Sequence, residues 1–109
     1  MHKIMDKEYI RERLIEEGYI VENGIDGTID RLCQLDGKAG EMFQYWLKTK
    51  KIKKFEAIQG IDVQFLRKEL KMKDPAIILA YGMLLKDPER NAMLIKRMVN
   101  KKISMKFPK

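Results

Sequence analysis

The chain has 109 residues, of which 45% are hydrophobic and 36% are charged; this composition excludes a disordered chain and predicts one folded domain with a heavily charged surface. The longest uncharged apolar run, residues 75–85, has 11 residues, which is too short for a membrane-spanning helix because such a helix needs about 20. The single cysteine excludes an internal disulfide. Together with a start that has no signal-peptide pattern, it predicts a cytoplasmic protein.

The formal charge of +7 is distributed unevenly along the chain. Residues 1–47 carry 6 Lys+Arg and 10 Asp+Glu, a net of −4, whereas residues 48–109 carry 17 Lys+Arg and 6 Asp+Glu, a net of +11. This separation predicts an anionic partner for the basic part. A solvated lysine-rich surface without a partner is the alternative explanation.

The first predicted element is a helix that starts after Asp6, a candidate N-cap, and ends near Glu17 with Gly18 as the stop. Its inward face is predicted to contain Ile10, Leu14 and Ile15. A second, short helix is predicted over residues 28–35, with Asp26 or Thr28 as its cap.

A third helix is predicted over residues 38–49, because its apolar residues recur at i, i+3, i+4, i+7 and i+8. This apolar stripe consists of Ala39, Met42, Phe43, Trp46 and Leu47.

Residues 52–72 allow two interpretations. Asp62 is a candidate N-cap for a helix that buries Phe65, Leu66 and Leu70, with a helical turn before Gly60. The alternative is a short β-hairpin near residues 52–65 with Gln59-Gly60 as its turn. The run RKELKM favours the helix, since it contains good helix formers and no β-branched residue.

Two Asp-Pro pairs, Asp74-Pro75 and Asp87-Pro88, each predict a helix start, with aspartate as the cap and proline at the first helical position. The segment AIILAYGMLL between them is apolar on every side, which predicts a helix at the centre of the core. The last helix is predicted from Pro88 to about Val99, burying Ala92, Ile95 and Met98 or Val99. The fold class is therefore all-α, a single compact domain of five or six short helices over residues 1–99, followed by a frayed basic tail, 100–109.

Methionine is abundant, with eight residues in the chain. Four of them lie at positions predicted to face the core, where a flexible thioether fills gaps. These are Met42, Met83, Met93 and Met98.

The stretch Asp26–Asp30 resembles the middle of a calcium-binding EF-hand loop. Aligning Gly27 with the invariant glycine at position 6 places oxygen-bearing side chains at positions 5, 7 and 9. Position 3 is then Gly24, and position 12, where a bidentate glutamate closes the site, is Cys33. The sequence therefore predicts a glycine-bearing turn and no metal site.

The residues needed for common catalytic sites are missing. One histidine, His2, and one cysteine, Cys33, are too few for a zinc site, and the only serine, Ser104, lies in the tail. No glycine-rich nucleotide-binding motif occurs. We expect a non-enzymatic protein without a cofactor, a metal or an evident small-molecule substrate.

The leading functional prediction is a small basic nucleic-acid-binding protein that contacts mainly the phosphate backbone through lysine-rich surface. Lysine outnumbers arginine, the residue that makes the bidentate contact with guanine, and this favours binding that is independent of sequence. The candidate residues are Lys48, Lys50, Lys51, Lys53, Lys54, Arg67, Lys68, Lys71, Arg97, Lys101 and Lys102.

The two predicted helices 28–35 and 38–49 also loosely resemble a helix-turn-helix motif. Cys33 and Gly37 lie four residues apart, where that motif has a small residue and the turn glycine. However, Asp36 and Lys38 occupy positions that the motif buries. A hairpin over residues 51–65 would correspond to a wing.

The alternative function is a protein-interaction module, such as an adaptor, an inhibitor or an assembly factor of a larger machine. An acidic first helix containing Glu8, Glu12, Glu16 and Glu17 would suit a basic partner. The aromatic residues outside the core stripes are candidate anchors for it, namely Tyr9, Tyr19 and Phe107. A weak membrane-surface role for the basic tail is the third possibility.

Overall fold

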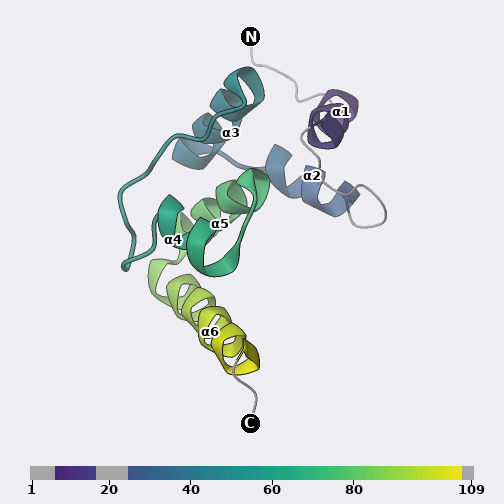
Figure 1. Ribbon diagram of the computed structural model, residues 1–109. Helices are drawn as coiled ribbons and strands as arrows, with labels where there is room; N and C mark the ends of the chain where they lie inside the picture. The colour runs from purple at the N-terminus through teal and green to yellow at the C-terminus, as the bar shows by residue number, and fades with distance from the viewer. Residues whose placement is uncertain (1–6, 17–24, 107–109) are drawn as a thin grey trace. The chain divides into compact units, whose positions relative to one another are not determined.

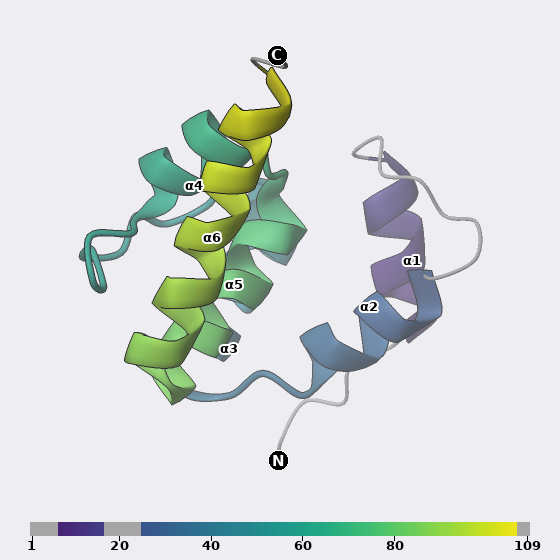
Figure 2. The same cartoon turned by 90° about the horizontal axis from the view of Figure 1, so that it is seen from below.

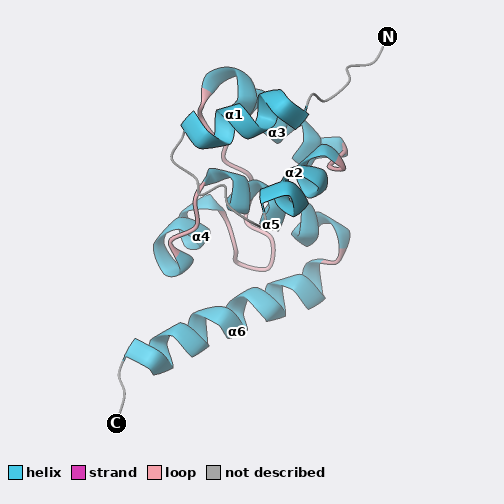
Figure 3. Ribbon diagram, turned by 90° about the vertical axis from the view of Figure 1, so that its right-hand side faces the viewer, coloured by secondary structure: helices cyan, strands magenta, loops and turns pink. Residues whose placement is uncertain are grey.

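The computed structural model describes residues 7–16 and 25–106, and it describes side-chain surroundings for 7–16 and 29–101. In these parts of the chain there are six α-helices and no β-strand (Figure 1, Figure 3). The helices are α1 Lys7–Glu16, α2 Ile25–Cys33, α3 Gly37–Thr49, α4 Val63–Leu70, α5 Asp74–Lys86 and α6 Pro88–Lys106. The predicted all-α class with five or six helices is confirmed. The predicted cap Asp6, the stop at Gly18 and the candidate anchors Tyr19 and Phe107 lie outside the described residues.

The chain divides into two compact units, Met1–Ile52 and Lys53–Lys109. The first unit contains α1 to α3 and has 9 Lys+Arg and 10 Asp+Glu. The second unit contains α4 to α6 and has 14 Lys+Arg and 6 Asp+Glu. The net positive charge therefore resides in the second unit. One domain over residues 1–99 stays a prediction.

The apolar stripe of α3 forms the largest part of the first unit's core. All five predicted residues, Ala39, Met42, Phe43, Trp46 and Leu47, are buried. The rings of Phe43 and Trp46 stack with their centroids 6.4 Å apart. Helix α2 packs against both α1 and α3, burying Ile29 and Leu32.

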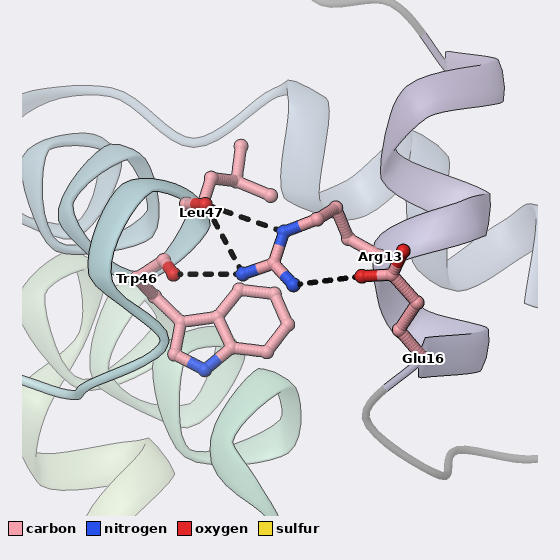
Figure 4. A network of polar contacts seen from close by, with 4 residues as sticks. All are labelled: Arg13, Glu16, Trp46 and Leu47. Carbon is pink, nitrogen blue, oxygen red and sulfur yellow. Dashed lines mark hydrogen bonds and ion pairs between the residues drawn. The ribbon is translucent and has the colours of Figure 1, made fainter.

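A buried arginine joins α1 to the C-terminal end of α3 (Figure 4). Arg13 is only 5% exposed. Its Nε and Nη2 donate to the carbonyl of Leu47 at 3.3 and 3.1 Å, and Nη2 also donates to the carbonyl of Trp46 at 3.3 Å. The guanidinium carbon lies 5.3 Å from the centroid of the Trp46 ring, and Nη1 bonds Glu16 at 3.4 Å. A cation is favourable beside the carbonyls at the end of a helix, because that end carries a partial negative charge.

The position of Arg13 corrects the predicted inward face of α1. Ile10 and Leu14 are buried as predicted, but Ile15 is 48% exposed. Ile10, Arg13 and Leu14 have the i, i+3, i+4 spacing of one helix face. Arg13 therefore occupies the third inward position, while Ile15 points to solvent.

The start of α2 also differs from the prediction. The helix begins at Ile25, so Asp26 and Thr28 lie inside it and do not cap it. After a short connection, α3 begins at Gly37, whose φ of +58° is a conformation that favours glycine. At Gly40, an added Cβ would lie 2.9 Å from the carbonyl oxygen of Leu35. Glycine at position 40 thus allows the α2–α3 connection to pass close to α3.

The ambiguous segment near residue 60 contains elements of both interpretations. Ile58 and Ile61 exchange two backbone hydrogen bonds of 2.9 Å around Gln59-Gly60. Both central residues have positive φ, +53° and +84°, as a type I′ turn requires. The pairing ends there, because Asp62 begins α4 by accepting a hydrogen bond from the Phe65 N–H at 2.9 Å. The turn and the Asp62 cap are confirmed, whereas the helical turn predicted before Gly60 is wrong, because residues 51–57 are irregular.

In the second unit, α6 packs along α5, and both contact α4 (Figure 2). The amide of Asn91 donates to the Met83 carbonyl at 2.7 Å, which fixes the start of α6 to the end of α5. The ring of Phe55 stacks on Tyr81 with a centroid separation of 4.1 Å. The buried residues here are Ile61, Val63, Leu66, Pro75, Ile77, Ile78, Ala80, Tyr81, Leu84, Ala92 and Ile95.

Helix α5 is not buried on every side. Met83 and Leu85 are 49% and 40% exposed, so the prediction of a fully enclosed helix is wrong. Met93 and Met98, predicted to face the core, are also exposed, and of the four methionines only Met42 is buried. A helix in a small unit has a solvent-facing side that apolar composition alone cannot reveal.

The two Asp-Pro pairs start helices in different ways. Asp87 precedes α6 and accepts a bond from the Arg90 N–H at 3.4 Å, as an N-cap does. Asp74 is the first residue of α5, which starts with no side-chain cap bond, and its carboxylate instead accepts a bond of 2.6 Å from Arg67 on α4. The last helix continues to Lys106, beyond the predicted end near Val99.

Candidate nucleic-acid interface

The first group of predicted cations follows α3. Lys48 lies in its last turn and Lys50 caps its C-terminus in the left-handed conformation, with a φ of +64°. Lys51, Lys53 and Lys54 follow on the irregular segment, and all five side chains are exposed. The boundary between the two compact units falls between residues 52 and 53, so this run is shared between the units.

The second group lies at one end of α4. Arg67 and Lys68 occupy its last turn, and Lys71 caps it with a φ of +57°. All three are exposed. Arg67 is paired with Asp74 at 2.6 Å and helps to hold α4 to α5. Lys68 and Lys71 are therefore the better candidates for a phosphate at this end of the helix.

The third group lies on α6. Arg97 and Lys101 are exposed and four residues apart, so they share one face of the helix. Lys102 belongs to α6, but its side chain lies outside the described part of the structure. Because α4 and α6 are in contact, the second and third groups belong to one packed body.

A sequence feature outside the predicted set adds to this surface. The side-chain nitrogen of Lys96 lies 3.9 Å from the position that a Cβ on Gly60 would take, which places it beside the Gln59-Gly60 turn. From Arg90 to the end of the chain the sequence contains seven Lys+Arg and no Asp or Glu. Lys96 belongs to this basic stretch of the sequence, whereas Arg90, which is also exposed, was missed; the absence of acids from Arg90 onward was the signal that could have identified it.

Part of the basic pattern is explained by helix ends. Lys48, Arg67, Lys68 and Lys86 lie in the last turns of α3, α4 and α5. Cations in the last turn stabilise a helix by about 0.3–1 kcal/mol through the partial negative charge there. This explanation does not apply to Lys53 and Lys54 on the irregular segment, nor to the exposed cations of α6 away from its ends, such as Arg97.

The helix-turn-helix resemblance has mixed support. Gly37 has the positive φ of a turn glycine, but Asp36 and Lys38 are exposed where the motif buries its residues. Glu41 is exposed on α3, three residues after Lys38. Its negative charge is unfavourable beside a phosphate. The wing is absent from this segment, because its pairing is limited to Ile58 and Ile61.

The segment that resembles an EF-hand loop does not form a loop, because Asp26 to Asp30 are helical. Among the residues with described surroundings, no three His, Cys, Asp or Glu side chains come together as a metal site. Cys33 is half-buried, and burial raises the pKa of its thiol, with Asp30 adding to the effect and Lys7 opposing it. No helix in the described part of the chain is long and apolar enough to cross a membrane.

Comparison with known proteins gives no further assignment. No protein-family model, no curated protein and no solved structure matches this chain. The fold and the surface define an all-α chain of two compact units, the second strongly basic.

Proposed function

We propose that the chain binds nucleic acid through its second unit, mainly by contacts between lysine side chains and backbone phosphates. The observation that supports the proposal is the concentration of exposed positive charge in one packed body. Residues 53–109 have a net charge of +8, against −1 for residues 1–52. The candidate cations of this unit with described side chains are all exposed: Lys53, Lys54, Arg67, Lys68, Lys71, Arg97 and Lys101.

Exposure matters because a phosphate contact releases counterions from the nucleic acid only if the cation can reach the backbone. In α6, Arg97 and Lys101 are about one helical turn apart, roughly 6 Å along the axis, so both lie on one side of the helix. In α4, Lys68 and Lys71 are three positions apart at the end of the helix. Each pair can therefore face the same stretch of nucleic-acid backbone.

Sequence-independent binding follows from the kind of residues present. Of the eleven predicted contact residues, only Arg67 and Arg97 are arginines, and Arg67 is engaged with Asp74. Lysine attracts phosphate as a point charge, whereas the bidentate contact to guanine is made most often by arginine. We expect affinities for unrelated duplexes of equal length to agree within a few-fold.

The test is fluorescence anisotropy with a labelled duplex and a single strand at two salt concentrations. Two charge-removal variants, Lys68→Gln/Lys71→Gln and Arg97→Gln/Lys101→Gln, are compared with the wild type. The matched control is Arg31→Gln/Lys38→Gln, which removes the same charge from exposed positions of the first unit. Weaker binding by both test variants, with the control close to the wild type, supports the proposal.

Two results would overturn it. One is the absence of binding to either probe at low salt. The other is a loss of affinity in the control equal to that of the test variants, because affinity would then follow the net charge and not a surface of the second unit. Circular dichroism of each variant verifies that its helices are retained.

A further inference from the structure

The outward faces of α1 and α6 have opposite charge, and both expose large apolar side chains. On α1, Glu8, Glu12 and Glu16 are four residues apart and exposed, so they lie along one face. Beside them Tyr9 and Ile15 are 46% and 48% exposed. The opposite face, with Ile10 and Leu14, is buried.

On α6, the outward face is basic. Arg90, Arg97 and Lys101 are exposed, and they lie seven and four residues apart, on one side of the helix. Between them Met93, Leu94 and Met98 are 55%, 39% and 49% exposed, while Ala92 and Ile95 face inward. No acidic residue occurs from Arg90 to Lys101.

From this complementarity we infer that the chain associates with itself, the outward face of α1 in one copy docking on the outward face of α6 in a second copy. Phosphate binding would use the cations of α6, but it gives no role to the exposed methionines and leaves the acidic face of α1 unexplained. A second copy accounts for both faces, because it supplies acids for the cations and the exposed apolar side chains of Tyr9 and Ile15 for the methionines.

The spacing of the charges allows the two faces to meet over about one helical turn. Glu12 and Glu16 are about 6 Å apart along α1, and Arg97 and Lys101 have the same separation along α6. Glu16 keeps 61% of its side chain exposed while it bonds Arg13 at 3.4 Å, so it can accept a second cation. Methionine side chains adapt to a partner surface, which suits the apolar part of the contact.

The contact joins two different surfaces of the chain. If each copy contributes both α1 and α6 to the other, the interface is isologous and closes as a dimer; if two copies share a single contact, it is heterologous and further copies can add. The inference does not rest on the nucleic-acid proposal. It would, however, occupy Arg97 and Lys101, so we expect association and binding of a duplex to compete.

The test is sedimentation velocity of nuclease-treated protein, free of nucleic acid, at about 0.15 M salt, where the Debye length of about 8 Å screens the repulsion between the distant parts of two cationic copies. The two variants reverse one face each, Glu8→Lys/Glu12→Lys on α1 and Arg97→Glu/Lys101→Glu on α6. The control Arg31→Glu/Lys38→Glu reverses two exposed charges on α2 and α3, outside both faces.

We expect wild type and control to associate with increasing concentration, and each face variant alone to sediment as a monomer. An equimolar mixture of the two face variants should associate again, because the reversed α1 of one is complementary to the reversed α6 of the other. Wild-type protein that stays monomeric at several hundred micromolar would overturn the inference. So would a mixture that stays monomeric while the wild type associates, since the contact would then involve other surfaces.

Discussion

Arg13 provides the strongest test of how the first unit is held together, because it is buried and bonds a different helix. Replacing Arg13 with alanine removes its three hydrogen bonds to the carbonyls of Leu47 and Trp46. It also removes the guanidinium that lies 5.3 Å from the centroid of the Trp46 ring. The helix α3 would then end without its buried cation.

The size of the effect follows from these contacts. Hydrogen bonds to a charged group contribute about 1.5–3 kcal/mol each, and a desolvated cation–π contact about 2 kcal/mol. These terms do not add fully, since burial of the guanidinium has a desolvation cost that alanine avoids. We expect Arg13→Ala to lower the free energy of unfolding by about 3 kcal/mol, a large part of the roughly 5–15 kcal/mol typical of a domain. Arg13→Lys should lower the free energy of unfolding by less than Arg13→Ala, because lysine keeps the positive charge, although it lacks the planar guanidinium.

The assay is urea unfolding followed by the fluorescence of Trp46, the only tryptophan of the chain. This probe lies at the contact itself and therefore reports on the first unit. The matched control is Glu12→Ala, an exposed change on the same helix, which should alter stability by no more than about 0.5 kcal/mol. If Arg13→Ala is no more destabilising than this control, the buried arginine does not hold α1 to α3.

Three further predictions concern local features. Asp62→Ala should lower the stability measured by thermal unfolding by about 1 kcal/mol, because Asp62 caps α4. Asp36→Ala should lower it much less, since the Asp36 side chain makes no cap bond to α3; equal losses of stability would contradict the assignment of the cap. Gly40→Ala should be destabilising despite the better helix propensity of alanine, because its Cβ would lie 2.9 Å from the Leu35 carbonyl oxygen; a melting temperature that rises would refute the close approach. Cys33 should be alkylated more slowly in the folded protein than in urea at pH 8, because burial raises the pKa of its thiol and lowers the thiolate fraction; equal rates would count against burial as the cause.

Local signals predicted most of the helices. The α3 stripe from Ala39 to Leu47 was identified completely, because i, i+3, i+4 spacing depends only on helix geometry. Asp62 and Asp87 were recognised as helix starts because a cap bond involves neighbouring residues. Near Gln59-Gly60 the sequence supported a hairpin turn and a helix starting at Asp62 as alternatives, and the structure contains both the turn and the helix start within a few residues.

Features that depend on tertiary contacts were missed. The burial of Arg13 requires the carbonyl end of α3 nearby, 33 and 34 residues away, which no local pattern encodes. Met83, Met93 and Met98 are apolar, as core residues usually are, but they lie on the solvent side of their helices. For the candidate interface, the sequence identified exposed cations but could not tell that Arg67 is paired with Asp74, or that the run from Lys48 to Lys54 is shared by two units.

The most direct test of the proposed function is the dependence of duplex affinity on salt, measured for the wild type and for Arg97→Gln/Lys101→Gln. For a phosphate-binding surface, the logarithm of the binding constant falls linearly with the logarithm of the salt concentration, with a slope of about −0.9 per phosphate neutralised. We predict that the variant's slope is shallower by up to about 1.8, one increment for each lost cation. A slope unchanged by the loss of both cations, or no binding at low salt, would contradict the proposal that this surface binds phosphates.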